Sequence, residues 1–249
     1  KLTQLISYIY IVLMLGFVIS NNIYQYAIVI ATSNIMNLIL QLYYLKKENV
    51  ILKFNLSFKD KEFIQMLKNL LPIFLSTGLY QFSLMINTAI SSRLGEGQVS
   101  ILSYSTQIVT MVNTLILGNV ILFIYPKMAA QINESINDAK NKLLDYLLLV
   151  FFIMLFILLM FILAGKEGIA LVYERGAFTK QITNIVYYVT FLYVIVLPLN
   201  AARDLFYKFF YADNDTYTPF KNSIKVSFLN IILSVVFSCF WGIYGIAVG

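Results

Sequence analysis

The feature that most limits how this chain can fold is a series of long, almost uninterrupted apolar runs. One of them, at residues 143–165, reads LLDYLLLVFFIMLFILLMFILAG and carries a single charge, Asp145, near its start. About 20 apolar residues in a helix cross the hydrocarbon core of a bilayer, and a helix satisfies its own backbone hydrogen bonds there. The sequence therefore predicts an all-α, polytopic membrane protein.

Composition agrees with this class and excludes several others. Hydrophobic residues make up 60% of the chain and charged residues 12%, against about 25% charged residues in soluble domains. There is no histidine and one cysteine, Cys239, which excludes the usual zinc sites, histidine-assisted nucleophiles and intrachain disulfides. We expect no enzyme, no metal and no cofactor, and no nucleic-acid partner, because no basic soluble face is visible.

Seven segments are long and apolar enough to be predicted as transmembrane helices. They cover residues 3–20, 24–45, 68–92, 99–125, 143–165, 185–207 and 220–240. Pro72 and Pro198 each predict a kink or a helix start. The chain opens on Lys1 and its pattern stops in mid-course at Gly249, so we expect a piece of a longer polytopic protein, with no signal peptide in this piece.

The lysines and arginines predict the orientation, because loops rich in these residues stay in the cytoplasm. Alternate connections place fourteen of them on one side of the membrane and four on the other. The four are Arg93, Lys166, Arg175 and Lys180. The side with fourteen is expected to be cytoplasmic, which places the turn LVYERGAFTK at 171–180 outside.

The longest polar interval, residues 46–67, is the predicted internal boundary. It separates two helices in 1–45 from five helices in 68–249. Within it, the stretch KDKEFIQMLKNLL carries apolar residues at helical spacing among lysines: Phe63, Met66, Leu67 and Leu70. This pattern predicts either an amphipathic helix in the cytoplasmic interface or the solvated first turns of the third span.

The fourth predicted span has one polar face. At 100° per residue, its polar and small residues fall within about 140° of arc. They are Ser103, Thr106, Gln107, Thr110, Asn113, Thr114 and Gly118. So many on one helix exceed what a single neighbouring helix needs, whereas a water-filled cavity would satisfy them. We therefore predict that this face lines a polar cavity.

Narrower polar stripes follow three other spans. They are Thr77/Gln81/Thr88/Ser92 and Ser76/Ser83/Asn87 on the third, Asn34/Asn37/Gln41 on the second, and Ser227/Asn230/Ser234/Ser238 on the seventh. Such stripes often form hydrogen bonds between packed helices, and the alternative is that they extend the cavity. Gln81, Asn87 and Asn230 are our further candidates for cavity residues, beside Ser103, Gln107, Thr110 and Thr114.

Several motifs carry a family resemblance from about residue 24 to the end. In order and spacing they are LLPIFLSTGLYQFSLMINTAISSRLGEGQVSILSYSTQIV, IYPKMA, LVYERGAF and FFYADNDTYTP. They resemble the MurJ/MviN family of lipid-linked peptidoglycan precursor flippases, within the multidrug/oligosaccharidyl-lipid/polysaccharide exporter superfamily. The resemblance implies a two-lobe architecture of fourteen helices. This chain is similar to helices five to eleven, with 46–67 as the cytoplasmic link between the lobes.

The resemblance also implies a function and a location. The family moves an undecaprenyl-pyrophosphate-linked sugar-peptide, lipid II, across the bacterial cytoplasmic membrane by alternating access of a central cavity. The implied partners are this lipid-linked oligosaccharide and the phospholipid bilayer, and the coupling ion is not defined. The family motif that reads YSTQIV here usually contains an arginine, where this chain has Gln107. A neutral amide makes a hydrogen bond to phosphate that is roughly half as strong as a charged donor would make.

Two connections supply candidate turn or gate residues. In the outer turn, Gly176 suits a tight turn, and Arg175 is positioned to hold backbone carbonyls or to pair with Glu174. On the cytoplasmic side, Asp215 suits a helix cap before Pro219. Arg203 is the remaining gate candidate.

Two alternatives to the flippase hypothesis stay open at the level of sequence. One is a transporter of the same superfamily with another polyprenyl-linked polysaccharide or a small cationic drug as its cargo. The other is a non-transporting membrane scaffold for envelope synthesis, which would need a partner surface in place of a water-accessible face.

Overall fold

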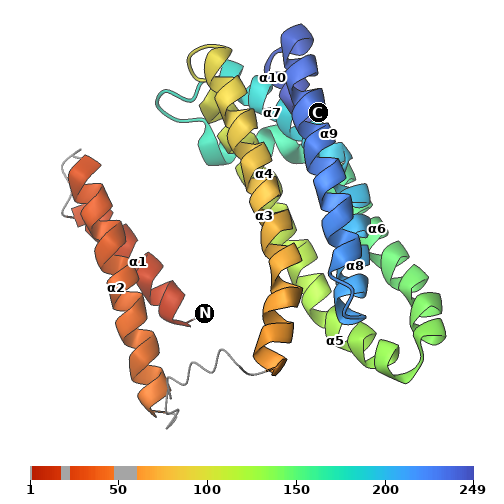
Figure 1. Ribbon diagram of the computed structural model, residues 1–249. Helices are drawn as coiled ribbons and strands as arrows, with labels where there is room; N and C mark the ends of the chain where they lie inside the picture. Colours follow the sequence, from red (N-terminus) through yellow and green to blue (C-terminus); the bar gives the residue numbers. More distant parts are fainter. Residues whose placement is uncertain (1, 18–22, 48–60) are drawn as a thin grey trace. The chain divides into compact units, whose positions relative to one another are not determined.

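The computed structural model describes residues 2–17, 23–47 and 61–249 (Figure 1). It separates into two compact units, Lys1–Phe58 and Lys59–Gly249. This division falls inside the polar interval 46–67. The described residues are almost entirely helical, which confirms the predicted all-α class.

The first unit contains two helices, α1 at Leu2–Phe17 and α2 at Ile23–Lys47. They pack against each other, and the hydroxyl groups of Tyr10 and Thr32 lie 3.1 Å apart across the contact. On α2, the amide of Gln41 donates to Asn37 Oδ1 at 3.1 Å, so this predicted stripe is bonded within its own helix.

The second unit contains the remaining elements in chain order. They are α3 (Lys61–Arg93), α4 (Gln98–Val112), the π-helix η1 (Asn113–Leu117), α5 (Gly118–Glu134), α6 (Ile136–Tyr173), α7 (Lys180–Ile195), α8 (Leu197–Ala212), α9 (Tyr217–Trp241) and α10 (Ile243–Val248). Helices α4, η1 and α5 follow one another without a break and together make one crossing.

Every predicted span falls on helix. Five helical segments are individually long and apolar enough to cross a membrane: Tyr24–Lys47, Phe63–Arg93, Gln98–Glu134, Ile136–Tyr173 and Tyr217–Trp241. The helices α7 and α8 are long and apolar enough only as a pair, which is bent by 44° and counts as a sixth span if it crosses as one. Pro198 lies in the first turn of α8 as a helix start. The first predicted span is a shorter apolar helix, Thr3–Gly16, and residues 18–20 of that prediction lie outside the described chain.

The stretch predicted as either an interfacial helix or the first turns of the third span belongs to α3. That helix runs unbroken from Lys61 to Arg93, with Pro72 inside it. Residues 61–70 are therefore continuous with the span. The other residues of the 46–67 interval before Lys61, apart from Lys46 and Lys47, lie outside the described part of the chain.

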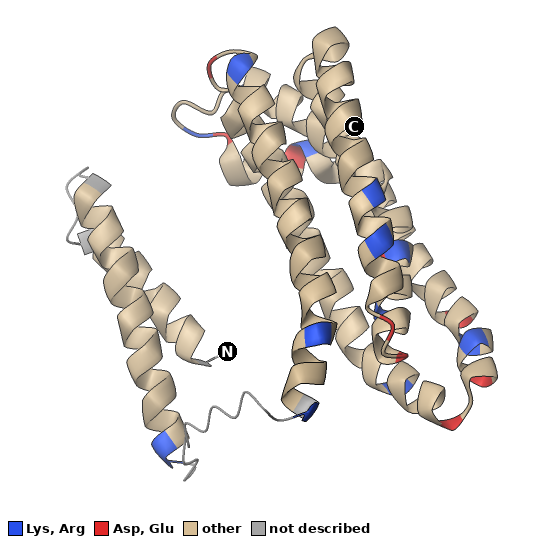
Figure 2. Cartoon of the chain, viewed as in Figure 1, with Lys and Arg blue, Asp and Glu red and all other residues tan. Residues whose placement is uncertain are grey.

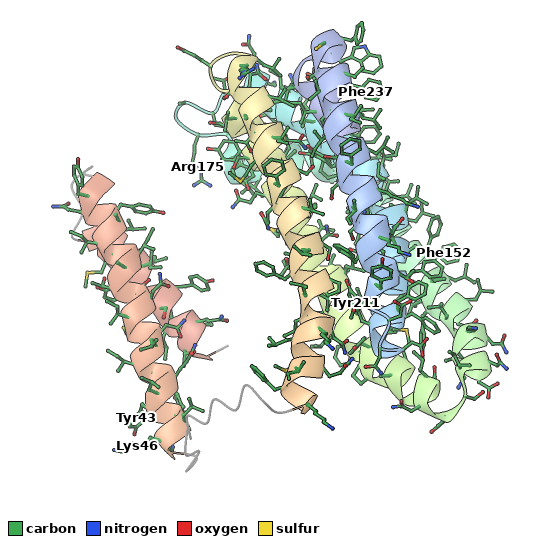
Figure 3. All side chains as sticks on the ribbon, in the orientation of Figure 1. Tyr43, Lys46, Phe152, Arg175, Tyr211 and Phe237 are labelled. Carbon is green, nitrogen blue, oxygen red and sulfur yellow. The ribbon has the colours of Figure 1, made fainter. Side chains whose placement is uncertain are left out.

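Two apolar cores hold the second unit together. One joins α5, α8 and the first half of α6 around Met128, Met154 and Leu205. The other joins α4, α7, α10 and the last part of α6 around Val186 and Ile246. Phe152 of α6 points away from both, toward the outside of the bundle (Figure 3), as expected for a helix with a lipid-facing side.

Most charges of the second unit lie toward its two ends, with two further blue segments part-way along α9 (Figure 2). One end contains the start of α3, the α5–α6 turn and the α8–α9 turn, and it carries most of the lysines. The other end, with the α3–α4 and α6–α7 turns, carries Arg93, Lys166, Arg175 and Lys180. This arrangement agrees with the alternation on which the predicted orientation rests.

Candidate functional site

Helix α4 packs on α7 through one side only. Ile101, Leu102 and Ser105 are buried there, and the Ser105 hydroxyl donates to the Val186 carbonyl at 3.4 Å. At 100° per residue, the predicted polar face lies on the opposite side of α4. The face is therefore not sealed by a neighbouring helix of its own unit.

The polar residues of this face are accessible. The four cavity candidates on it, Ser103, Gln107, Thr110 and Thr114, are all exposed. The Thr110 hydroxyl donates to the Thr106 carbonyl at 2.8 Å, within the helix. Among the described residues, the Gln107 amide has no hydrogen-bond partner. Its donors and acceptor are free for water or a ligand.

A π-helix interrupts the same face. Residues Asn113–Leu117 form η1, between α4 and α5. Single π-turns within α-helices are rare and frequently occur at functional sites. The predicted polar residues Asn113 and Thr114 lie in this turn. No pattern in the sequence distinguishes a π-turn from the surrounding α-helix, so the sequence reasoning missed it.

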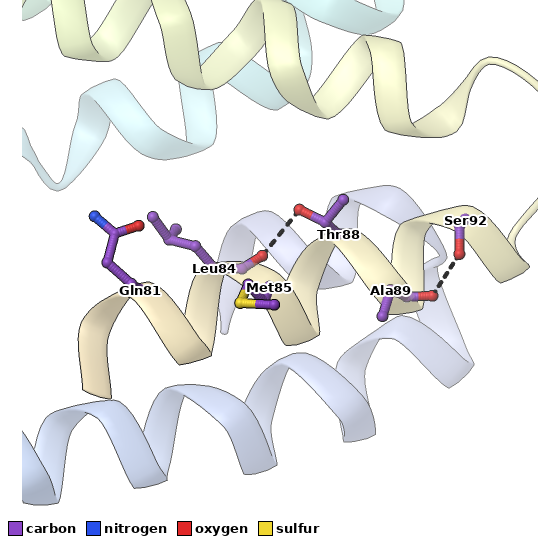
Figure 4. Close-up of a pocket in the computed structure, with 6 residues that line it drawn as sticks. All are labelled: Gln81, Leu84, Met85, Thr88, Ala89 and Ser92. Atoms are coloured by element: carbon purple, nitrogen blue, oxygen red, sulfur yellow. Dashed lines mark hydrogen bonds between the residues drawn. The ribbon is translucent and has the colours of Figure 1, made fainter. Parts of the chain in front are cut away.

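A shallow groove of about 400 Å³ follows α3 (Figure 4). Its lining comes from one helix: Gln81, Leu84, Met85, Thr88, Ala89 and Ser92. The hydroxyls of Thr88 and Ser92 donate to the carbonyls of Leu84 and Ala89, at 2.9 and 2.8 Å. The Gln81 amide is exposed and projects from the helix into the space of the groove (Figure 4).

Asn87 and Asn230, two of the predicted cavity residues, lie in the contact between α3 and α9. Asn87 is buried, and its amide donates to Asn230 Oδ1 at 3.5 Å. The Ser83 hydroxyl donates to the same oxygen at 2.6 Å. This polar contact joins α3 to α9. This contact corresponds to the first of the two interpretations of the narrow stripes, in which their polar side chains form hydrogen bonds between packed helices.

The outer turn at 171–180 is fixed by several contacts. Gly176 has φ +58°, a conformation that glycine adopts without penalty. The Arg175 guanidinium donates to the Val172 carbonyl, and the Thr183 hydroxyl donates to Glu174 Oε2 at 2.9 Å. Arg175 thus holds a backbone carbonyl, as predicted, while Glu174 bonds to Thr183. Arg175 lies at this end of the unit in Figure 3.

An aromatic cluster connects the outer turn to the polar helix. Tyr104 of α4 lies 5.0 Å from Tyr173 and 5.1 Å from Phe178, between ring centroids. Tyr104 is next to Ser103, so the aromatic cluster lies beside the polar face. The sequence shows Phe178 as an aromatic residue but does not show that Tyr104 is its partner.

The candidates on α8 and in the α8–α9 turn, Arg203 and Asp215, have local partners. Arg203 pairs with the neighbouring Asp204, with Nη2 3.0 Å from Oδ1. Asp215 Oδ1 accepts the backbone N–H groups of Tyr217 and Thr218 at 2.9 and 3.0 Å. Hydrogen bonds from Thr218 are the main cause that lowers the pKa of the Asp215 carboxyl from its ordinary value. Asp215 is thus a turn and cap residue, as predicted.

Among the described residues, no group of acidic or cysteine side chains could hold a metal ion. What the geometry offers is an accessible polar face on a membrane-crossing helix, attached to a fixed outer turn.

Comparison with known proteins decides the family. Residues 3–249 match the family described as "Lipid II flippase MurJ". The chain belongs to the MurJ family. This confirms the resemblance carried by the motifs between residues 24 and 249.

Individual MurJ relatives are distant. A protein of Rickettsia prowazekii named "Probable lipid II flippase MurJ" is 26% identical over 191 residues, which are 76% of this chain and 38% of that protein. A protein of Vibrio cholerae with the same name is 22% identical over 223 residues, covering 89% of this chain and 42% of that protein. The chain thus spans less than half the length of these two relatives.

A solved MurJ structure shows the same fold. It is described as "Lipid II flippase MurJ, inward closed conformation" and has a TM-score of 0.77 and 24% sequence identity to this chain. The match covers 99% of this chain and 51% of the solved one. The helical arrangement described above is therefore that of about half of a MurJ-type membrane protein.

Proposed function

We propose that this chain forms part of a flippase that moves a lipid II-type precursor across the bacterial cytoplasmic membrane. The cargo is an undecaprenyl-pyrophosphate-linked sugar-peptide, moved by alternating access of a central cavity. The observation that carries the proposal is the accessible polar face of α4 and η1. Family membership and the names of the relatives support it.

The physical need for such a face is clear. A charge at the centre of a bilayer costs at least about 2.5–3.5 kcal/mol, so the head group requires polar partners along its path while its lipid tail stays in hydrocarbon. Ser103, Gln107, Thr110 and Thr114 supply hydroxyl and amide groups on α4 and η1. Gln81 adds an amide from the groove on α3.

The remaining parts of the proposal concern organisation. Residues 1–45 would end the first lobe, 46–67 would link the lobes on the cytoplasmic side, and 68–249 would begin the second lobe. Arg175 and Gly176 would shape the outer end of the passage. Arg203 and Asp215 would lie at its cytoplasmic end.

The test is replacement of Gln107 by leucine in the full-length protein. Leucine has a side chain of similar size but lacks the amide that could donate or accept hydrogen bonds. We expect Gln107→Leu to lower complementation strongly in bacteria depleted of their own lipid II flippase, with normal amounts of folded protein in the membrane. The matched control is Gln181→Leu, the same change at an exposed position in the first turn of α7.

Full complementation by Gln107→Leu would contradict the proposal. A second measurement separates it from the scaffold alternative. In the full-length protein with Cys239 and any other native cysteine replaced by alanine, single cysteines at positions 103, 107, 110 and 114 should react with a water-soluble maleimide, because the face is wetted. Unreactive cysteines at all four positions would show a dry face and favour a scaffold.

A further inference from the structure

A basic surface on α8 and α9 has no role in the passage described above. The two helices carry four cations: Arg203, Lys208, Lys221 and Lys225. Only Arg203 is in an ion pair, with Asp204. Within the described chain, the three lysines have no carboxylate at ion-pair distance.

The two lysines of α9 share one face. They are four residues apart and lie about 40° from each other around the helix. The contact with α3 uses the opposite side, where Asn230 Oδ1 accepts hydrogen bonds from Ser83 and Asn87. Figure 2 shows two blue segments part-way along α9.

Toward the other end of α9, the lysine face becomes apolar. Phe228, Ile232 and Val236 continue it and are all exposed. Two lysines followed by exposed apolar residues along one helix face have the composition expected where head groups give way to acyl chains.

Tyrosines hold two of the ammonium groups at this level. Lys221 Nζ lies 4.3 Å from the centroid of the Tyr217 ring, and Lys208 Nζ lies 5.8 Å from that of Tyr211. The Asn222 amide donates to the Tyr207 hydroxyl at 2.7 Å, which ties α9 to α8 at the same place. Tyrosine is enriched at the boundary between head groups and hydrocarbon.

The nearby acids do not neutralise these lysines. Asp204 is engaged by Arg203. Asp215 accepts two backbone N–H groups, and Lys221 contributes only the smallest part of its lowered pKa. A lysine inside a membrane helix requires an anionic partner or a path for its head to the interface.

We propose that Lys221 and Lys225, with Tyr217, bind the phosphate of an anionic phospholipid of the cytoplasmic leaflet. The uncompensated positive charge selects the anionic head group, and the exposed apolar residues above it accept the acyl chains. The site differs from the passage on α4 and η1, so it does not depend on the proposed flipping activity.

The test uses the full-length protein in detergent, titrated with phosphatidylglycerol or phosphatidylcholine and observed by native mass spectrometry. The wild type should prefer phosphatidylglycerol. In the double variant Lys221→Gln/Lys225→Gln, that preference should fall about fivefold for each lysine, from the usual attraction of one cation near an anionic surface.

Two matched variants make the result decisive. Lys140→Gln/Lys142→Gln removes the same charge from the exposed start of α6, at the same end of the unit, and should keep the preference. Lys221→Arg/Lys225→Arg keeps the charge and should also keep the preference for phosphatidylglycerol. An unchanged preference in the Lys221/Lys225 glutamine variant, or an equal loss in the α6 variant, would overturn the proposed site.

Discussion

Individual side chains fix the turns that join the crossing helices. In the inner turn, the Asp215 carboxylate accepts two N–H groups at the start of α9, which have no partner within the helix itself. In the outer turn, the buried Thr183 hydroxyl donates to Glu174. These contacts set the angle at which one helix follows another.

The inner turn yields a prediction on stability. Replacing Asp215 by alanine removes the acceptor of two N–H groups and should destabilise the protein by about 1 kcal/mol, the usual value of a helix cap. The measurement is the thermal unfolding of the full-length protein in detergent. Asp213→Ala is the control, because Asp213 is exposed. Equal unfolding temperatures for the two variants would contradict the role of Asp215.

The Asp215 carboxylate also predicts how the stability of the protein depends on pH. Its pKa is lower in the folded protein than in the unfolded chain. The contribution of Asp215 to the free energy of unfolding is therefore fully present above the ordinary aspartate pKa of about 3.9. It is lost as the pH falls through the lower pKa of the folded protein. The difference in stability between wild type and Asp215→Ala should shrink over that acidic range and stay constant near neutral pH.

At the scale of elements, helix α9 packs closely against two other helices, α3 and α10. On one side, Ser83 and Asn87 of α3 meet Asn230. On another, α10 folds back after Gly242, which has φ +56°, and Gly245 lies directly against the α9 backbone at Phe237. Both contacts depend on small side chains.

Gly245→Ala is a test of this second contact. The added methyl group would overlap the Phe237 carbonyl, so α10 must shift, and overpacking of this kind costs about 1–3 kcal/mol. We expect a lower unfolding temperature for the full-length protein. Gly168→Ala is the control, since nothing lies within 4 Å of the added methyl group there. A Gly245→Ala protein as stable as the wild type would contradict this close approach.

The helices themselves were predictable from sequence, because an apolar run of bilayer length has few other ways to satisfy its backbone. The polar face around Gln107 was predictable too, since its residues recur at the helical period over many turns. The role of the short polar stripes was not predictable. Asn87 and Asn230 have the spacing of a cavity stripe and of an interhelical contact alike, and only the position of the neighbouring helix distinguishes the two.

Other features depend on tertiary contacts that no local pattern encodes. The π-turn η1 contains ordinary helix-forming residues, and the aromatic cluster joins Tyr104 to residues about 70 positions away along the chain, a separation that helical periodicity does not reach. The roles of the turn residues were easier to predict, because Gly176 and Asp215 act within a few residues of their own position.

For the whole molecule, the distribution of lysines and arginines predicts which end faces the cytoplasm. In full-length protein with Cys239 and any other native cysteine replaced by alanine, Ala177→Cys should react with a membrane-impermeant maleimide added to intact spheroplasts. Asp213→Cys should react only after the membrane is opened, because the α8–α9 turn lies at the basic end. Reaction of Asp213→Cys in sealed spheroplasts would reverse the proposed orientation.

The two apolar cores are connected by three helical segments of the second unit. Helix α6 runs through both over 38 residues without a break. The α4–α5 segment contains η1, whose Leu117 belongs to one core, and the α7–α8 pair bends at Val196, between the residues of the two cores. Two of the three connections therefore contain an irregular turn, and Asn113 and Thr114 of the polar face lie in one of them.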